Sequence, residues 1–463
     1  MREFLKLYAF FSLFYVVQSF NQRGNLLLHE EPAKAHPVIR AFTTGTTFIF
    51  AIPNSHIGVN DTSYTEEITL IVTNYDTVNP ATVTVSTPSA VFKTTTFTIA
   101  PLQNYRFSVP AEIQVGYKRE PKNEWFYSSQ SIYLTADTKV SLVAQNLASD
   151  SISGGMFVVY PTCTLGQSYR TVGDDTSRFP VRNDWSIIAT QDNTAITVNP
   201  PLFGQTSFSL NAGQILVFSS NDFSNVNTQI IGNFPIAMVV GTACGLGYYS
   251  NKLCNYEASM LFPVPAGTAF PFTQFISEDP GEGQLLILAQ DNDTLVFSNG
   301  RAISTLDAFG YASFLVTDVY ITTNKPVYAF AFSSMRQDGQ GSPFLVHIPA
   351  VSQFTNQSYI QVTTGLKSKQ GWAEQHFIRL ETEMTATQSK SKLSIDGSPV
   401  SPSLFQRQGT SNIYMVDYPI SPGTHTIETI DPAVKYAAIV YGFMQFIAYA
   451  YTPGIDLPTF GNC

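Results

Sequence analysis

The sequence predicts an all-β protein of four tandem β-sandwich-like repeats, and three observations lead to this prediction. Charged residues make up only 13% of the 463 residues, against about 25% in an average soluble protein. Ser, Thr, Asn and Gln take their place, and these residues suit sheet faces and turns better than helix surfaces. Apolar runs that end in proline recur about every 85 to 110 residues. Sustained helical periodicity is absent from the sequence.

The N-terminal residues have the pattern of a secretory signal. A basic start precedes an apolar run over 7–17, and Val17 and Ser19 supply the small residues that a signal peptidase needs. The run is shorter than the about 20 residues of a membrane-spanning helix, so a cleaved signal over 1–19 is favoured over an uncleaved anchor. No later stretch is long and apolar enough to span a bilayer. We expect a secreted, extracellular protein without a membrane span, in which a linker over 20–44 follows the signal.

Four segments carry the repeated pattern. Their apolar runs end at Pro53, Pro161, Pro265 and Pro349. The second and third segments share an alternating strand with a Gln-Asp-Asn turn inside it, at 186–198 and 285–297. Asp and Asn side chains bond nearby backbone and accept turn geometry, which favours a turn at each of these steps. The predicted repeats span residues 45–150, 151–255, 256–340 and 341–463.

Sandwiches compete with a second architecture. In the alternating stretch at 194–198, Ala195 and Thr197 face one side of a sheet and the remaining residues face the other. Repeated sheets of this kind also build a β-propeller-like ring. Its blades, however, usually need only about 40 to 50 residues, so tandem sandwiches are favoured.

The cysteine count fits an oxidising compartment. Four cysteines are present, Cys163, Cys244, Cys254 and Cys463, and they allow three pairings. Cys244 and Cys254 bracket a Gly/Asn-rich loop, which favours a local disulfide and leaves Cys163 for Cys463. A terminal Cys463 could equally join two chains as a disulfide-linked dimer. A metal site is disfavoured, because no C-x-x-C spacing occurs and no histidine lies close to these thiols in sequence.

Three sequons predict N-glycosylation in a secreted chain. They lie at Asn60, Asn292 and Asn356. Aromatic residues in polar segments are a separate candidate site, because exposed rings stack on sugars or anchor protein partners. The predicted ligand loops contain Tyr248, Tyr249, Trp125 and Tyr127.

Catalytic motifs are absent from the sequence. No HExxH, GxSxG, P-loop or Rossmann fingerprint occurs, so no enzyme activity, catalytic residue or cofactor is predicted. His347 lies in an apolar strand and is expected to be a hydrogen-bonded core residue. The alternative is a carbohydrate-active hydrolase using acids such as Asp175 or Asp279, which would need a carboxylate pair facing one cleft. A net charge of -9 gives no basic surface for nucleic acid.

Several blocks of sequence follow one another in a familiar order. They are YPTCTLGQSYRTV, SIIATQDNTAITV, FPIAMVVGTACG with CNYEASMLFPV, KPVYAFAFSS, KLSIDG and AAIVYGFMQFIAYAYTPGIDL. From about residue 45 to Leu457, the chain resembles the N-terminal domain of the IgG Fc-binding protein family in its invertebrate form. The resemblance implies a secreted, non-enzymatic domain. The von Willebrand factor D repeats of mucus-associated relatives are missing, so polymer formation does not carry over. Immunoglobulin binding does not carry over either, because the sequence offers no residue set identifiable as that site.

These observations together predict a secreted, non-enzymatic binding or adhesion protein that recognises an extracellular glycoprotein or another protein. Loops and exposed strand edges would carry the recognition. A structural component of a mucus, cuticle or matrix layer is the alternative, with weak multivalent contacts. The hydrolase is the less favoured third hypothesis.

Overall fold

The structure of the chain is a computed structural model. It describes residues 39–41, 43–55, 65–116, 124–148, 153–173, 183–200, 204–220, 226–245, 255–263, 267–279, 282–315, 317–362, 373–384, 393–429, 431 and 433–460. The predicted signal peptide at 1–19 and most of the predicted linker lie outside these residues. Within the described part of the chain, no helix is long and apolar enough to cross a membrane.

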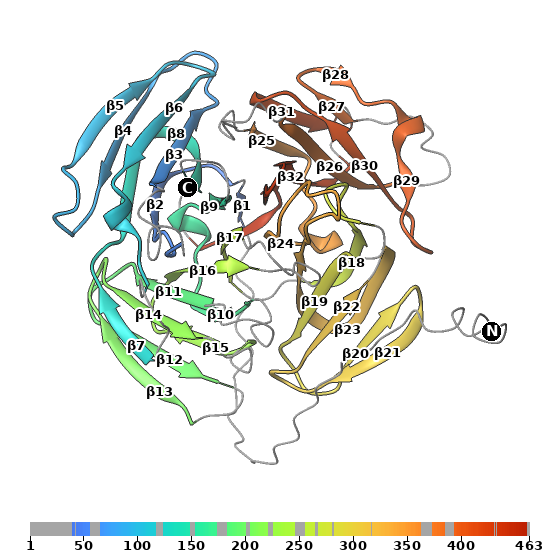
Figure 1. Cartoon of the computed structure of the whole chain (residues 1–463), viewed down its shortest axis with the longest axis horizontal. Coiled ribbons are helices and arrows are strands. Elements are labelled where there is room, and N and C mark those ends of the chain that lie inside the picture. The colour runs from blue at the N-terminus through green and yellow to red at the C-terminus, as the bar shows by residue number, and fades with distance from the viewer. Residues whose placement is uncertain are drawn as a thin grey trace, which may run out of the picture.

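The described chain consists of strands and short 3-10 helices, and its strands fall into four units (Figure 1). Unit 1 contains β2 (Gly45–Phe50), β3 (Glu66–Asn74), β4 (Ala81–Ser86), β5 (Thr95–Ile99), β6 (Asn104–Val109), β8 (Ile132–Ala148) and β9 (Gly154–Val159). Unit 2 contains β10 (Ser168–Arg170), β11 (Asn183–Ala189), β12 (Thr194–Asn199), β13 (Thr206–Leu210), β14 (Ile215–Ser220), β15 (Gln229–Gly232), β16 (Ile236–Gly245) and β17 (Asn255–Met260).

The second half of the chain repeats the same order of strands. Unit 3 contains β18 (Gly267–Thr273), β19 (Gln284–Ala289), β20 (Thr294–Ser298), β21 (Arg301–Leu306), β22 (Tyr311–Leu315), β23 (Asp318–Phe332) and β24 (Leu345–His347). Unit 4 contains β25 (Gln357–Val362), β26 (Gln375–Glu383), β27 (Leu393–Ile395), β28 (Ser398–Pro399), β29 (Gln406–Arg407), β30 (Ile413–Pro419), β31 (Gly423–Thr429), β32 (Tyr436–Met444) and β33 (Ile447–Gly454).

Each unit is a sandwich of an outer and an inner sheet. The outer sheets have the strand orders β5-β4-β8-β2, β13-β12-β15-β10, β21-β20-β23-β18 and β28-β27-β31-β25. The inner sheets share the four-strand orders β6-β3-β8-β9, β14-β11-β16-β17, β22-β19-β23-β24 and β30-β26-β32-β33, and those of units 2 and 4 carry a fifth strand, which pairs with β14 in unit 2 and is β29, paired with β30, in unit 4. In unit 1 the long strand β8 runs through both sheets, and in unit 3 β23 does the same. In units 2 and 4 two consecutive strands take its place, β15 with β16 and β31 with β32. The predicted all-β fold of sandwich-like repeats is confirmed.

Inner and outer strands differ in burial, and this difference matches the pattern of apolar residues in the sequence. Every described residue of β9 and β11 is buried, because the inner sheets pack on both faces, and such strands read as continuous apolar runs. In β4 and β12 every second residue is buried, because one face of an outer sheet meets solvent. The charge-poor composition arises on these outer faces.

The Gln-Asp-Asn turns predicted for the second and third repeats are confirmed. Asn193 and Asp293 adopt positive φ angles of 59° and 54°, a conformation that Asn and Asp tolerate better than most residues. The hydroxyl of Thr194 donates to the carbonyl oxygen of Gln191 at 2.7 Å, and this bond fixes the start of β12.

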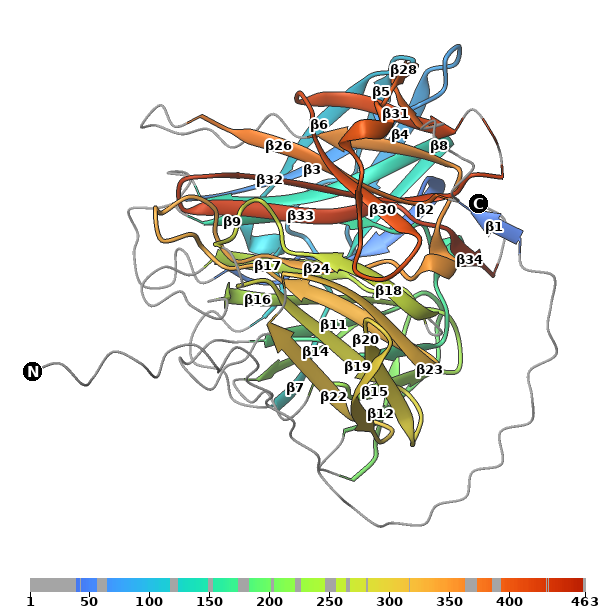
Figure 2. The ribbon, with the colours of Figure 1, turned by 90° about the vertical axis from the view of Figure 1, so that its right-hand side faces the viewer.

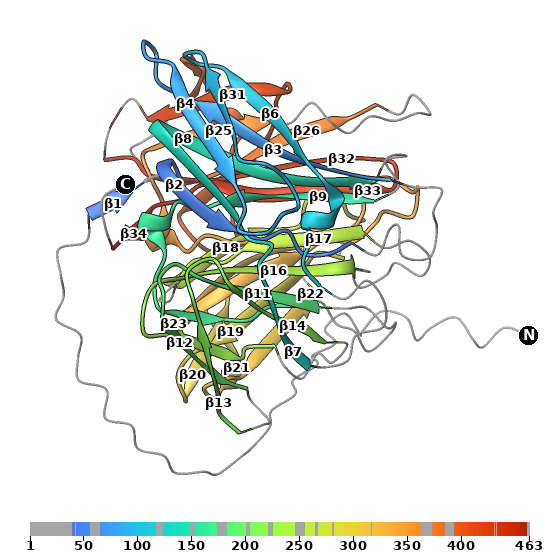
Figure 3. The same ribbon diagram turned by 90° about the vertical axis from the view of Figure 1, so that its left-hand side faces the viewer.

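The last strands of the four units meet at the centre of the molecule. β9 packs against β17 and β33, and β24 packs against the same two strands. Figure 2 shows these four strands between the upper pair of units, 1 and 4, and the lower pair, 2 and 3. Figure 3 shows β9 and β17 side by side from the opposite side. The four sandwiches therefore close into a ring rather than extend into a rod.

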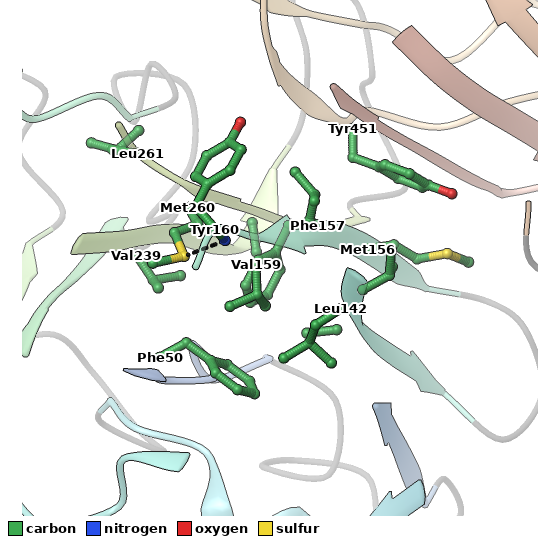
Figure 4. Packing of buried hydrophobic residues seen from close by; sticks show 14 of the residues in the cluster. Phe50, Leu142, Met156, Phe157, Val159, Tyr160, Val239, Met260, Leu261 and Tyr451 are labelled. Atoms are coloured by element: carbon green, nitrogen blue, oxygen red, sulfur yellow. Dashed lines mark hydrogen bonds between the residues drawn. The ribbon is translucent and has the colours of Figure 1, made fainter. Parts of the chain in front are cut away.

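Side chains from different units interlock at this centre. Figure 4 shows Phe157 and Val159 of β9 between Met260 of β17 and Tyr451 of β33. The backbone N–H of Tyr160 donates to the sulfur of Met260 at 3.2 Å, a weak acceptor. Apolar packing thus joins the units more than polar contact does at this point.

Strand pairing does not follow the chain order everywhere. β7 (Glu124–Ser128) lies between β6 and β8 in sequence but pairs with β14 of unit 2. The runs ending at Pro161 and Pro349 are β9 and β24, which pair with β8 and β23 in the preceding sandwich, beyond the predicted boundaries at 150 and 340. Near the two ends of the chain, β1 (Ile39–Ala41) pairs with β34 (Leu457–Thr459).

Candidate functional site

Two of the predicted ligand aromatics lie on β7, the edge strand that crosses from unit 1 to unit 2. The prediction placed Trp125 and Tyr127 in a polar loop, and this is corrected by the structure: they belong to a strand paired with β14. Successive side chains of a strand point to opposite faces of the sheet, so Trp125 and Tyr127, two residues apart, lie on the same face. The Tyr127 side chain is 57% exposed, whereas Trp125 is half-buried.

Packing gives these two aromatics different roles. The Trp125 ring lies 4.5 Å from the Phe218 ring and 5.4 Å from the Phe208 ring, between centroids. Phe218 stacks in turn on Trp185 at 5.1 Å. Trp125 therefore closes the edge of the unit 2 sandwich, and Tyr127 is the aromatic of this strand that a ligand can reach. Tyr248 and Tyr249 lie outside the described residues.

Disulfide bonds hold both described cysteines. Cys163 and Cys244 are each disulfide-bonded, and none of the described cysteines is free. Cys254 and Cys463 lie outside the described residues, so the pairing stays a prediction. Gly245 of β16 is the register partner of Asn255 of β17, which places the residues next to Cys244 and Cys254 across a hairpin from each other.

Asn255, which follows Cys254, joins all four units. Its Nδ2 donates to the carbonyl oxygens of Pro343 at 2.8 Å and Ala448 at 3.0 Å. Its Oδ1 accepts from the backbone N–H of Gly154 at 2.7 Å. The three partners belong to units 3, 4 and 1, and Asn255 itself begins β17 of unit 2. Asn255 lies in the block CNYEASMLFPV that carries the family resemblance, but the sequence analysis assigned no role to its side chain.

His347 lines a small cavity at the centre of the molecule. Residues of β9, β17, β24 and β33 line a cavity of about 10 Å³ there, close to the space that one water molecule needs. The His347 side chain is 2% exposed, and neither ring nitrogen has a hydrogen-bond partner in the described chain. Burial holds the pKa of His347 well below its ordinary value. The prediction of a core residue is right, and that of a satisfied one is wrong.

A buried ionic cluster joins units 3 and 4. Arg379 of β26 is fully buried, and its guanidinium forms two 2.9 Å hydrogen bonds to the carboxylate of Asp417. It also donates to the carbonyl oxygens of Thr273 and Gln274 and lies 4.2 Å from the centre of the Phe275 ring. Every polar edge of the guanidinium thus meets an acceptor, which offsets the cost of burying it.

Burial favours the protonated form of two carboxyl groups near this arginine. Burial raises the pKa of Glu278 and that of Glu381 to about 8 each, although the charge of Arg379 acts to lower both. The neighbouring Asp279 is half-buried, and its carboxylate accepts from the backbone N–H of Gln337 at 2.6 Å. Asp279 therefore holds a loop together. The other hydrolase candidate, Asp175, lies outside the described residues.

Predicted modification and metal sites can be placed in part. Asn292, in the turn before β20, and Asn356 are both exposed, whereas Asn60 lies outside the described residues. Their glycosylation stays a prediction. Among the described residues, no three His, Cys, Asp or Glu side chains gather where they could hold a metal ion.

The chain belongs to the IgGFc-binding family. The family model described as IgGFc binding protein matches residues 155–442, more than half of the chain and a shorter stretch than the expected resemblance. The match runs from β9 to β32, so most of unit 1 lies outside it. Neither the curated proteins nor the solved structures show a match to the chain. The family is one of binding proteins rather than enzymes.

Proposed function

We propose that the chain is a secreted, non-enzymatic binding or adhesion protein that recognises an extracellular glycoprotein or another extracellular protein. Membership of the IgGFc-binding family carries this proposal. It is supported by disulfide-bonded Cys163 and Cys244, because such bonds persist mainly in oxidising compartments. A ring of four rigid sandwiches also suits a scaffold that presents loops and strand edges to partners.

Tyr127 is the first contact residue that we propose. Tyrosine is enriched among the residues that dominate binding energy, because it offers a large rigid ring and a polar hydroxyl. Its 57% exposure on an edge strand leaves the side chain open to a ligand, and Trp125, two residues earlier on the same strand, packs on Phe218 and Phe208 and holds the strand in place. The alternative role, as a structural component of a mucus, cuticle or matrix layer, could use the same surface. It would differ in the affinity of each single contact, which would be weak.

The test is a binding series with the purified full chain. Biolayer interferometry against an immunoglobulin Fc fragment, its deglycosylated form and a mucin should show saturable binding to at least one of them. Tyr127→Ala should weaken this binding about tenfold or more, and deglycosylation tells glycan recognition from protein recognition.

Tyr105→Ala is the matched control, because Tyr105 is 42% exposed on β6, an edge strand of another unit. It should leave the affinity within about twofold. Failure of the wild-type chain to bind any of the three in a saturable way would overturn the proposed function. Equal losses in the two variants would remove Tyr127 from the contact surface.

A further inference from the structure

A row of threonines crosses the outer sheet of unit 1. Thr84 of β4 is the register partner of Thr96 on β5 and of Thr135 on β8. Thr135 is paired in turn with Thr47 of β2. The four side chains therefore stand opposite one another on four hydrogen-bonded strands, and Figure 3 labels three of these strands, β2, β4 and β8. At about 4.8 Å between strands, the row is about 14 Å long.

These threonines face solvent. Val83 and Val85, the neighbours of Thr84 along β4, are fully buried, so Thr84 points to the opposite, outer side of the sheet. Thr47, Thr96 and Thr135 are exposed, and Thr84 is half-buried. The hydroxyl oxygens of Thr84 and Thr96 lie 2.9 Å apart.

A second, shorter row lies beside the first. Thr82 of β4 pairs with Thr98 of β5, and both are exposed. We call these six residues the threonine face: Thr47, Thr82, Thr84, Thr96, Thr98 and Thr135. Threonine is stiff about its first side-chain torsion, so the hydroxyl and methyl groups of this face are largely fixed before any ligand arrives.

The corresponding rows of the other units are interrupted. In unit 2, Ile231 lies between Thr197 and Ser168. In unit 3, Phe297 of β20 pairs with Thr322 of β23, and in unit 4 the charged Glu428 pairs with Ser394. Among the described outer sheets, an unbroken row of four threonines is therefore specific to unit 1, the unit that lies mostly outside the family match.

The threonine face suits an uncharged, hydroxyl-rich polymer. Each threonine hydroxyl offers one donor and two acceptors, and each methyl group offers an apolar contact for the C–H face of a sugar ring. No member of the face is charged. The carboxylate of Asp137 accepts a 2.7 Å hydrogen bond from the backbone N–H of Thr82 at the end of the second row, and it would repel a sulfated or sialylated chain.

We propose that the threonine face binds an extended, neutral polysaccharide laid across the four strands. This inference rests on the proposed function, that of an extracellular binding protein. It adds a second binding surface to that of Tyr127 and gives the class of its ligand. One row of neutral hydrogen bonds binds weakly, so affinity arises when a polymer engages several protein molecules at once. Because no charges take part, binding does not change with ionic strength.

Affinity electrophoresis of the full chain tests this assignment. The protein should be retarded in native gels that contain hydroxyethylcellulose or xylan, and not in gels that contain heparin. The triple variant T84V/T96V/T135V keeps the shape and the strand preference of threonine but removes three hydroxyls. It should weaken retardation about tenfold or more, since three hydroxyls can no longer bond to the polymer.

Thr197→Val, in the interrupted row of unit 2, is the matched control and should be retarded like the wild type. A circular dichroism melt checks that each variant is folded. Unchanged retardation of the folded triple variant, retardation by heparin alone, or no retardation of the wild type would each overturn the assignment. Glycoprotein binding through Tyr127 is measured separately, so failure of one proposal does not look like failure of the other.

Discussion

The backbone N–H of Phe460 donates a 2.7 Å hydrogen bond to the carbonyl oxygen of Cys163. Cys163 lies in η2 (Thr162–Thr164), which packs against β34. Cys463 follows Phe460 by three residues, and three extended residues reach about 10 Å. This places the last cysteine of the chain within range of Cys163, whose own disulfide partner the structure does not describe.

We therefore expect Cys163 to be bonded to Cys463 within one chain. Mass spectrometry of unreduced peptides should recover this link, and a second one between Cys244 and Cys254. Cys163→Ser and Cys463→Ser should each lower the free energy of unfolding by about 2–5 kcal/mol. The double variant should lose no more than either single one, because both remove the same bond.

Non-reducing electrophoresis tests whether Cys463 is bonded within one chain or between two chains. A monomer band is expected for the wild type. A dimer that disappears on reduction and in Cys463→Ser would show instead that Cys463 joins two chains.

Asn255 should be the most costly asparagine to replace in the described chain. Asn255→Ala removes three buried hydrogen bonds and strands their partners in units 1, 3 and 4, each worth about 1 kcal/mol. Thermal and urea unfolding should show a loss of roughly 3 kcal/mol.

Asn233→Ala is the control for this prediction, because the exposed Asn233 also uses both ends of its side chain, on Ala195 and Asn193. Its loss should stay below about 1 kcal/mol, since water can replace exposed partners. Equal losses in the two variants would show that Asn255 does not hold the units together.

The local structure was predictable because it follows from neighbouring residues. Continuous apolar stretches became the inner strands such as β9, alternating ones became outer strands such as β12, and Asp and Asn marked the turns. The long-range contacts were not predictable in the same way. The partners of Asn255 lie 101, 88 and 193 residues away along the chain, and no periodicity reports such distances.

Two site residues illustrate the same limit. Trp125 was expected in a loop because its flanking residues are polar, and its pairing strand belongs to another unit. His347 was expected to be hydrogen-bonded because buried polar groups usually are. His347 lies at the centre because β9, β17, β24 and β33, one strand from each unit, pack together there. The apolar stretch around His347 does not reveal this packing.

Acid should destabilise the ring through His347. Burial holds the pKa of His347 in the folded protein well below its ordinary value of 6.5, so the unfolded chain binds the proton first. The neutral imidazole contributes stability above pH 6.5, and this contribution is lost as the pH falls towards the folded pKa. Between pH 7.5 and 5, the melting temperature of His347→Leu should therefore fall less, or rise more, than that of the wild type.

A second buried histidine serves as the comparison for this measurement. His425 has partners on both ring nitrogens, Asp396 at 2.6 Å and Ser421 at 2.9 Å. His425→Leu should leave the acid slope of His347 in place. A slope that persists unchanged in His347→Leu would place the acid-sensitive group elsewhere.

The buried carboxyl groups beside Arg379 act in the opposite direction. Burial raises the pKa of Glu278 and that of Glu381 from an ordinary value of 4.5 to about 8, so the folded state holds protons that the unfolded state has released. The two protonated carboxyl groups contribute their full stabilisation below pH 4.5, and this stabilisation declines as the pH rises to 8. Glu381→Gln keeps the shape of the side chain and removes its titration, so between pH 5 and 8 the variant should lose less stability, or gain more, than the wild type. Glu383→Gln, an exposed position on the same strand, should leave that loss unchanged, and an equal effect of the two variants would mean that burial at the Arg379 cluster is not its cause.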